Sequence, residues 1–171
     1  MNAETIHPAA LGLEELLSLC EVRRVRRSGP GGQRRNKVET GMVLRHLPTG
    51  IIAEANERRS LAENRKIAFK RLRVNLALCV RREATSGASA SRIWQLRCRN
   101  GQIVVSLDHV DYAAMLAEAL DIVFANDADV KSAAIVLGCT ASQLTKFLKS
   151  EPRALSIVNS RRGELGLHRL K

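Results

Sequence analysis

The chain has 171 residues, 45% of them apolar and only 3% aromatic, so its core must be built mainly from aliphatic side chains. Its formal net charge of +11 indicates a polyanionic partner. Residues 1–83 carry 17 basic and 9 acidic side chains, a net +8, so this half should meet that partner first. Four widely spaced cysteines disfavour a disulfide framework or a metal site, and no secretory signal or membrane-spanning run is visible. We therefore expect a soluble cytoplasmic protein with no membrane partner, metal or cofactor.

The chain begins with a helical pattern that gives way to an alternating one. Leu13 and Leu16 beside two glutamates predict a short amphipathic helix over residues 11–19. From Cys20 the period changes to two, which predicts a strand with Val22 facing the interior.

Two more strands are expected further along. Residues 38–47 alternate so that Met42 and Leu44 share one side with His46. A Pro-Thr-Gly turn then closes a hairpin with a third strand over residues 51–55. Because His46 ends its strand just before this turn, a structural role is favoured over a catalytic one.

The segment between the first two strands, residues 28–37, cannot continue a helix or a strand. Its first five residues include three glycines and a proline. Gly31 and Gly32 leave the backbone bare just before the amide of Gln33, and several cations follow. This composition suits a loop that enters a narrow polyanionic pocket; the alternative is a flexible basic turn. The phosphate-loop pattern G-x-x-x-x-G-K-[ST] and the dinucleotide pattern G-x-G-x-x-G are both absent from it.

A capping box formed by Ser60 and Glu63 predicts a long helix from Leu61 to about Arg82. Its expected buried stripe is Leu61, Ala68, Leu72, Leu76 and Cys79. Its expected outward cations are Arg65, Lys66, Lys70, Arg71 and Arg73. So many cations on one helix favour contact with phosphates over a merely solvated face.

The second half has its own organisation after a small, polar segment, residues 84–91, which predicts a linker. Residues 93–98 and 103–107 predict a hairpin turned by Asn-Gly, with Trp94 in the core. Apolar periodicity predicts helices over residues 108–124, 129–137, 141–149 and 152–165. The turn at Gly138 gives the middle two helices the spacing of a helix-turn-helix unit.

Three sequence blocks, in this order, carry a resemblance to a known family. They are S-G-P-G-G-Q-x-x-N-K at 28–37, V-L-x-H-x-P-T-G-I at 43–51, and R-S-x-x-x-N-R at 59–65. Together they resemble the catalytic domain of class I peptide chain release factors over roughly residues 19–82. The resemblance implies an α+β fold, in which a small mixed sheet with one long packed helix carries a projecting Gly-Gly-Gln loop. We expect a release-factor-like catalytic domain at 11–83, a linker at 84–91, and a mostly helical accessory domain with the helix-turn-helix-like unit at 92–171.

The resemblance implies hydrolysis of the peptidyl-tRNA ester in the ribosomal peptidyl-transferase centre. In that family the Gln backbone amide donates to the oxyanion and its side chain places water. Gln33 would take both roles, while Gly31 and Gly32 would allow the close approach. A methyltransferase that modifies Gln33 is a further candidate partner, since the residue is methylated in some relatives.

Large-subunit rRNA and peptidyl-tRNA are the implied partners of the basic side chains. The residues expected to bind RNA are Arg26, Arg27, Arg34, Arg35, Asn36, Lys37, Arg59, Arg65, Lys66 and Lys70. The family commonly has His-Val after the Gln, whereas this chain has Arg34-Arg35, and Leu61 stands where Gln is usual.

The stop-codon-reading tripeptides of such factors, P-x-T and S-P-F, do not occur in this sequence. The chain therefore resembles the short, codon-independent branch that rescues stalled ribosomes. Two alternatives stay open: a non-catalytic helix-turn-helix regulator, with Ser142, Gln143, Thr145 and Lys146 facing base edges, and a ribosome-binding quality-control factor that does not hydrolyse.

Overall fold

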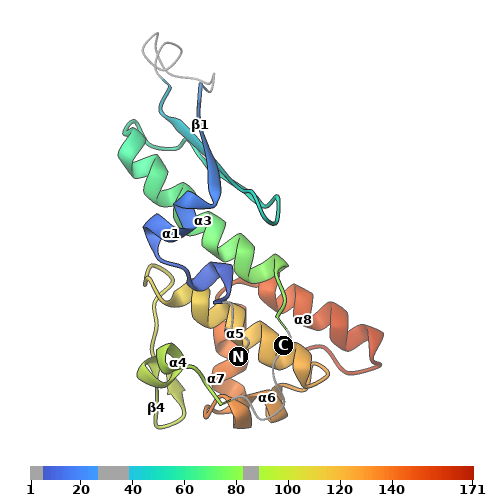
Figure 1. Ribbon diagram of the computed structural model, residues 1–171. Helices are drawn as coiled ribbons and strands as arrows, with labels where there is room; N and C mark the ends of the chain where they lie inside the picture. The colour runs from blue at the N-terminus through green and yellow to red at the C-terminus, as the bar shows by residue number, and fades with distance from the viewer. Residues whose placement is uncertain (1–5, 27–38, 83–88) are drawn as a thin grey trace, which may run out of the picture. The chain divides into compact units, whose positions relative to one another are not determined.

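The computed structural model describes residues 6–26, 39–82 and 89–171, which fall into two units, 1–76 and 77–171 (Figure 1). The first unit contains η1 (Pro8–Ala10), α1 (Leu13–Ser18), β1 (Cys20–Val25), β2 (Gly41–His46), β3 (Ile52–Ala55) and most of α3 (Leu61–Cys79). The predicted boundaries at 83 and 92 stay a prediction, since residues 84–88 of the expected linker lie outside the described residues.

The three predicted strands of the first unit are confirmed and form one sheet in the order β1-β2-β3. Val22 pairs with Leu44, which in turn pairs with Ala53. Both pairings are antiparallel, so the described sheet is antiparallel and not mixed as expected. The β2–β3 turn is too short for a parallel crossover, and Gly50 supports its tight geometry with a φ of 71°.

One face of the sheet is buried, and its residues alternate along the strands. Met42, Leu44 and His46 on β2 and Ala53 and Ala55 on β3 are each at most 5% exposed. Opposite residues of an antiparallel pair share a face, so Val22 lies on the side of Leu44. Val22 is nevertheless 47% exposed, so the prediction that it faces the interior was right in side but wrong in burial; the buried part of this face lies over β2 and β3.

Helix α3 protects the other edge strand, β3, with two side chains. The Asn75 amide donates to the Ile52 carbonyl at 3.0 Å, and the Arg71 guanidinium donates to the Glu54 carbonyl at 2.7 Å. Edge carbonyls left unpaired would invite pairing with another chain. Arg71, expected to be an outward cation, is therefore exposed but committed to the sheet.

The predicted helix 61–82 is confirmed as α3, with corrections at individual positions. The Ser60 hydroxyl accepts from the Glu63 amide, as the capping box predicts, at a long 3.4 Å. Ala68, Leu72 and Leu76 are fully buried, whereas Leu61 is half-buried and Cys79 is exposed.

Arg73 was expected to face outward and is instead buried. Its Nε donates to the Ala9 carbonyl in η1 at 2.8 Å, and its guanidinium lies 5.9 Å from the centre of the Phe69 ring. The N-terminal segment covers this side of the helix, and the long arginine supplies a donor to the covering backbone.

The second unit is mostly helical, as predicted. It contains α4 (Arg92–Arg97), β4 (Cys98–Arg99), β5 (Gln102–Ile103), α5 (Tyr112–Ala125), α6 (Val130–Val136), α7 (Ala141–Lys149) and α8 (Pro152–Glu164). Helix α5 is buried along most of its length and contacts α4, α6, α7 and α8, so it forms the centre of this unit. The α+β class is thereby confirmed for the chain.

The hairpin predicted from residue 93 is wrong in its first strand, because residues 92–97 form α4. The Ser91 hydroxyl accepts from the Trp94 amide and starts a helix, which brings the indole into the core. Trp94 is fully buried and its Nε1 donates to the Leu137 carbonyl at 2.7 Å. The predicted Asn100-Gly101 turn is present, with φ of 51° and 75°, between two very short strands.

The predicted helix-turn-helix unit is present as α6 and α7. Asp129 caps α6 through the amides of Lys131 and Ser132, Gly138 takes a φ of 64° in the turn, and Thr140 caps α7. No helix in the described residues is long and apolar enough to cross a membrane.

Candidate functional site

The residues that carry the Gly-Gly-Gln hypothesis fall in a segment that the structure does not describe. Residues 27–38 lie outside the described residues, and with them Gly31, Gly32, Gln33, Arg27, Arg34, Arg35, Asn36 and Lys37. What the structure describes is the loop root, the name used here for Val25, Arg26, Glu39, Thr40 and Gly41, from which this segment leaves the sheet.

Gly41 is required where the two strands meet at the loop root. It pairs with Val25 across the β1–β2 ladder. A Cβ added to Gly41 would lie 2.7 Å from Val25 Cγ2 and 2.8 Å from the Val25 carbonyl oxygen. Since the second contact is with backbone, any larger residue would push the strands apart just where the loop begins.

Asn64 ties the first turn of α3 to the loop root. This side chain is fully buried. Its Nδ2 donates to the Thr40 carbonyl at 2.7 Å and to the Arg58 carbonyl at 2.8 Å, while its Oδ1 accepts from the Arg58 amide at 2.9 Å. The amide thus uses both donors and an acceptor, as a buried polar group must, and holds strand, loop and helix together.

An exposed ion pair also crosses the loop root. Arg26 Nε lies 3.2 Å from Glu39 Oε1, with more than 45% of each side chain exposed. Pairs this exposed contribute only about 0–1 kcal/mol, so the register of the root rests on Gly41 and Asn64 and not on this contact.

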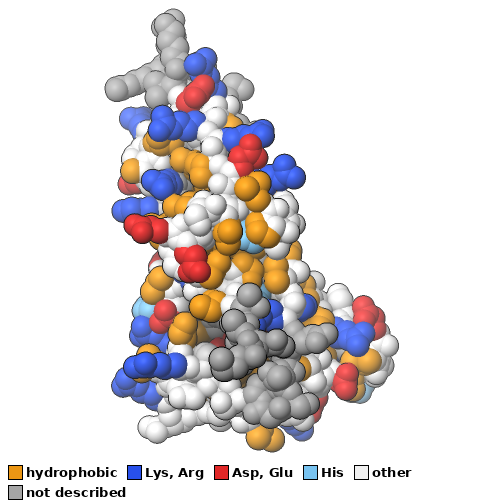
Figure 2. Space-filling model, viewed as in Figure 1, with side chains coloured by type: hydrophobic (Ala, Val, Ile, Leu, Met, Phe, Trp, Pro, Cys, Tyr) orange, Lys and Arg blue, Asp and Glu red, His pale blue; other side chains and the backbone are white. Residues whose placement is uncertain are grey.

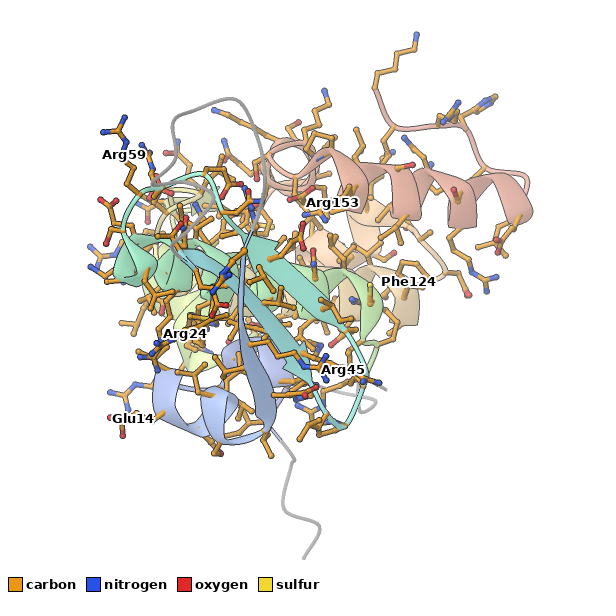
Figure 3. The ribbon with its side chains drawn as sticks, turned by 90° about the horizontal axis from the view of Figure 1, so that it is seen from above. Glu14, Arg24, Arg45, Arg59, Phe124 and Arg153 are labelled. Atoms are coloured by element: carbon orange, nitrogen blue, oxygen red, sulfur yellow. The ribbon has the colours of Figure 1, made fainter. Side chains whose placement is uncertain are left out.

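Exposed cations surround this end of the first unit. Arg59, Arg65 and Lys66 are exposed and form no ion pair with another described residue, and Lys70 is exposed on the same helix. Arg24, which pairs with Met42 near the loop root, is also exposed, and Arg45 is exposed beside His46 at the other end of β2. Neither was among the predicted RNA-binding residues. Figure 2 shows several Lys and Arg side chains on the visible face of this unit. Figure 3 labels Arg24, Arg45 and Arg59, which come from β1, β2 and the segment before α3.

His46 lies at the opposite end of β2 from the loop root. It lies five positions beyond Gly41, which is about 17 Å along a strand. Its Nδ1 is 2.8 Å from the Thr49 hydroxyl, and its backbone carbonyl and amide close the hairpin turn. Burial lowers the pKa of His46 below 6.5 and favours the neutral ring. These contacts give His46 a structural role at the turn, as predicted, and its Nε2 is buried with no hydrogen-bond partner among the described residues.

Two residues that shape the loop root had no assigned role in the sequence hypothesis. Asn64 belonged to the third matching block, but its burial and its bonds to Thr40 could not be foreseen from spacing. Gly41 offered a signal, since a glycine at the start of a strand often marks a close backbone approach. Within the described residues, no cluster of His, Cys, Asp and Glu could hold a metal ion.

Comparison of the sequence with known families identifies the family to which the chain belongs. The sequence matches the RF-1 domain over residues 17–106, more than half of the chain. The chain therefore belongs to the RF-1 domain family. The match covers β1, the loop root, the sheet and α3, and it ends before α5.

Individual relatives are similar over a shorter region. The human mitochondrial translation release factor in rescue is 42% identical over 70 residues, which make up 41% of this chain and 41% of the human protein. Its zebrafish counterpart, from Danio rerio, is 48% identical over 59 residues, 34% of this chain and 38% of that protein. Peptide chain release factor 1 of Parafrankia sp. is 36% identical over 72 residues, 42% of this chain and 20% of that factor. These matches span less than half the length of each relative. No solved structure matches the chain.

Proposed function

We propose that this protein releases nascent peptides from ribosomes by promoting hydrolysis of the peptidyl-tRNA ester. Membership of the RF-1 domain family and the names of the relatives support the proposal. The observation that carries it is the bond from Asn64 to Thr40. Asn64 belongs to the third sequence block, and Thr40 follows the first block by three residues, so the third block is bonded to the loop root from which the Gly-Gly-Gln segment leaves.

The proposed chemistry needs no general base or metal from the protein. The backbone amide of Gln33 donates to the oxyanion that forms when water attacks the ester carbonyl, and its side-chain amide places that water. A preorganised donor of this kind typically lowers the barrier by about 3–4 kcal/mol, and positioning the water supplies more. Gly31 and Gly32 let the backbone approach the ester without a Cβ in the way.

The basic side chains around the loop root would bind rRNA of the large subunit and the acceptor end of the tRNA. The described members of this set are all exposed, so phosphates can reach them: Arg26, Arg59, Arg65, Lys66 and Lys70. The proposal extends to Arg27, Arg34, Arg35, Asn36 and Lys37 by sequence alone. Contacts of this kind go mostly to phosphates, so ribosome binding should weaken steeply as salt rises.

We further infer that release does not depend on a codon. The human and zebrafish relatives are named for rescue, and they match this chain at 42% and 48% identity. We infer that the substrate is peptidyl-tRNA on stalled ribosomes in the cytoplasm. A methyltransferase that modifies Gln33 is a further proposed partner.

The test is peptide release from ribosomes stalled at the end of an mRNA without a stop codon. Wild-type protein should release the labelled peptide, and Gln33→Ala should release it at least tenfold more slowly. Release by the wild type only when a stop codon occupies the A site would contradict the codon-independent part. A Gln33→Ala protein as fast as the wild type would contradict the proposed role of Gln33.

A further inference from the structure

A hollow of about 450 Å³ lies in the second unit, outside the region that matches the RF-1 domain. It is lined by α6, α7, α8 and the segment that follows α8. The lining residues are Asp129, Val130, Lys131, Ala141, Ser142, Thr145, Lys146, Lys149, Arg162, Leu170 and Lys171. Its size falls within the range of about 300–1,000 Å³ of small-ligand sites.

The lining of this hollow is strongly cationic. Lys131, Lys146 and Lys149 are exposed, and none of them forms a side-chain hydrogen bond or ion pair within the part of the chain that the structure describes. Asp129 is the acidic member of the lining. Its carboxylate is occupied by capping, because it accepts from the Lys131 and Ser132 amides and from the Ser132 hydroxyl. The three lysines therefore face the hollow without an ion pair, and the charge of Asp129 is opposed there by more cations than it can balance.

The wall formed by α7 is the face that would read DNA in a helix-turn-helix protein. Ser142, Thr145, Lys146 and Lys149 recur at helical spacing, so they share one side of α7. Thr145 Oγ1 donates to the Ala141 carbonyl at 2.8 Å, which engages its proton within the helix. This face contains no arginine, the residue that makes the commonest specific contact with guanine.

The C-terminal segment recesses this face. Asn159 accepts from the Leu170 amide at 2.7 Å and donates to the Leu170 carbonyl at 3.2 Å. Arg162 also donates to the His168 carbonyl at 2.7 Å. Held in this way, Leu170 lines the hollow beside α7. A recognition helix must protrude to enter a major groove about 12 Å wide, so a recessed α7 does not suit a duplex.

We propose that this hollow binds the phosphodiester backbone of single-stranded RNA. Three unpaired lysines suit phosphates, and a lining without an aromatic side chain offers no platform for stacking bases. Binding should therefore be salt-dependent and tolerant of sequence. The choice of RNA over other single strands rests on the proposed function of the chain.

Lysine acetylation footprinting of the full-length chain tests the site directly. A single-stranded oligouridine of 12 nucleotides should protect Lys131, Lys146 and Lys149 at least threefold, whereas free uridine monophosphate at the same nucleotide concentration should not. Equal protection by the mononucleotide would assign the hollow to a small ligand. Stronger protection by a 12-base-pair duplex, or no protection of these three lysines, would also overturn the proposal. The assay contains no ribosomes, so its result does not depend on peptide release.

A matched pair of variants separates the hollow from general positive charge. Lys146→Ala with Lys149→Ala removes two lining cations at exposed helix positions that tolerate alanine. Arg92→Ala with Arg99→Ala removes the same charge from exposed positions outside the hollow. The slope of log K against log salt for labelled oligouridine is negative. The first variant should make it less negative by about 1.4, while the second should leave it near the wild-type value. Equal slopes for the two variants would contradict the site.

Discussion

The side-chain amide of Asn64 donates to the carbonyl of Thr40 at 2.7 Å across 24 residues of sequence. This bond joins the first turn of α3 to the residue directly before β2, in the loop root. The same side chain holds both the amide and the carbonyl of Arg58. The helix start and the loop root are thus fixed by one fully buried residue.

Replacing Asn64 with alanine should destabilise the protein and slow peptide release. Three backbone groups at Thr40 and Arg58 would lose their buried partner, at a cost of about 2–3 kcal/mol. Urea unfolding measures the loss. Asn75→Ala is the matched control, because Asn75 donates to an exposed edge of the sheet and its loss should cost less than about 1.5 kcal/mol. Equal shifts for the two variants would contradict the role given to Asn64.

Gly41→Ala should be destabilising, although alanine is usually tolerated in place of glycine. The new Cβ would meet the Val25 carbonyl oxygen at 2.8 Å, and the strand pair would have to open. We expect a loss of about 1–3 kcal/mol in the free energy of unfolding. Gly163→Ala is the control, since nothing lies within 4 Å of its added Cβ in α8, and it should stabilise by about 0.5–1 kcal/mol. Two variants of like sign would show that crowding at the loop root is not the cause.

Protonation of Asp121 should make the second unit more stable as the pH falls from 7 to 4. Burial raises the pKa of Asp121 to about 6, although Arg81 at 2.8 Å and the Arg82 amide oppose the shift. Between pH 6 and 4 the folded state therefore holds a proton that the unfolded state has lost. The gain should be about 1–2 kcal/mol, less than the full shift implies because the pair is partly solvated. Burial also raises the pKa of Glu118, which adds to the same trend.

The check is the difference in free energy of unfolding between wild type and Asp121→Asn, measured from pH 4 to 7. In this difference the contributions of other groups cancel. The variant should be at least as stable as the wild type at pH 7 and should lose that advantage toward pH 4. A difference that does not vary with pH would mean that Asp121 titrates normally.

His46 should have the opposite pH dependence and no catalytic effect. Burial lowers its pKa below 6.5, so the unfolded state binds the proton first and stability falls as the pH drops below 6.5. His46→Gln keeps a polar group for Thr49 and should remove this dependence. Its rate of peptide release at pH 7.5 should stay within about threefold of wild type, since His46 is about 17 Å from Gly41 along the strand. A loss of a hundredfold would restore the catalytic reading.

The order of strands and helices could be predicted because local signals were strong. Pro-Thr-Gly closed the β2–β3 hairpin, Ser60 started α3, and Asp129, Gly138 and Thr140 marked the ends of α6 and α7. The prediction failed where distant contacts decided. Trp94 lies in a sequence pattern typical of a strand, but its indole donates a hydrogen bond to the Leu137 carbonyl and residues 92–97 form a helix.

Burial was harder to predict than secondary structure. Arg73 was expected among the outward cations, but η1 covers it. Val22 was expected to be buried, but it is 47% exposed. At the site, the motif indicated Gln33 and its glycines but not Asn64, because a bond between positions 40 and 64 leaves no trace in local spacing. The roles of residues 27–38 stay a prediction.

In the proposed mechanism, the backbone of residues 31–33 delivers a hydrogen-bond donor to the ester. The most direct measurement is the single-turnover rate of peptide release on stalled ribosomes for wild type and Gly32→Ala, with ribosome affinity measured by co-sedimentation. We predict a rate at least a hundredfold lower with affinity within about threefold, as expected for a lost transition-state donor. Equal rates for the two proteins at equal occupancy would contradict the account.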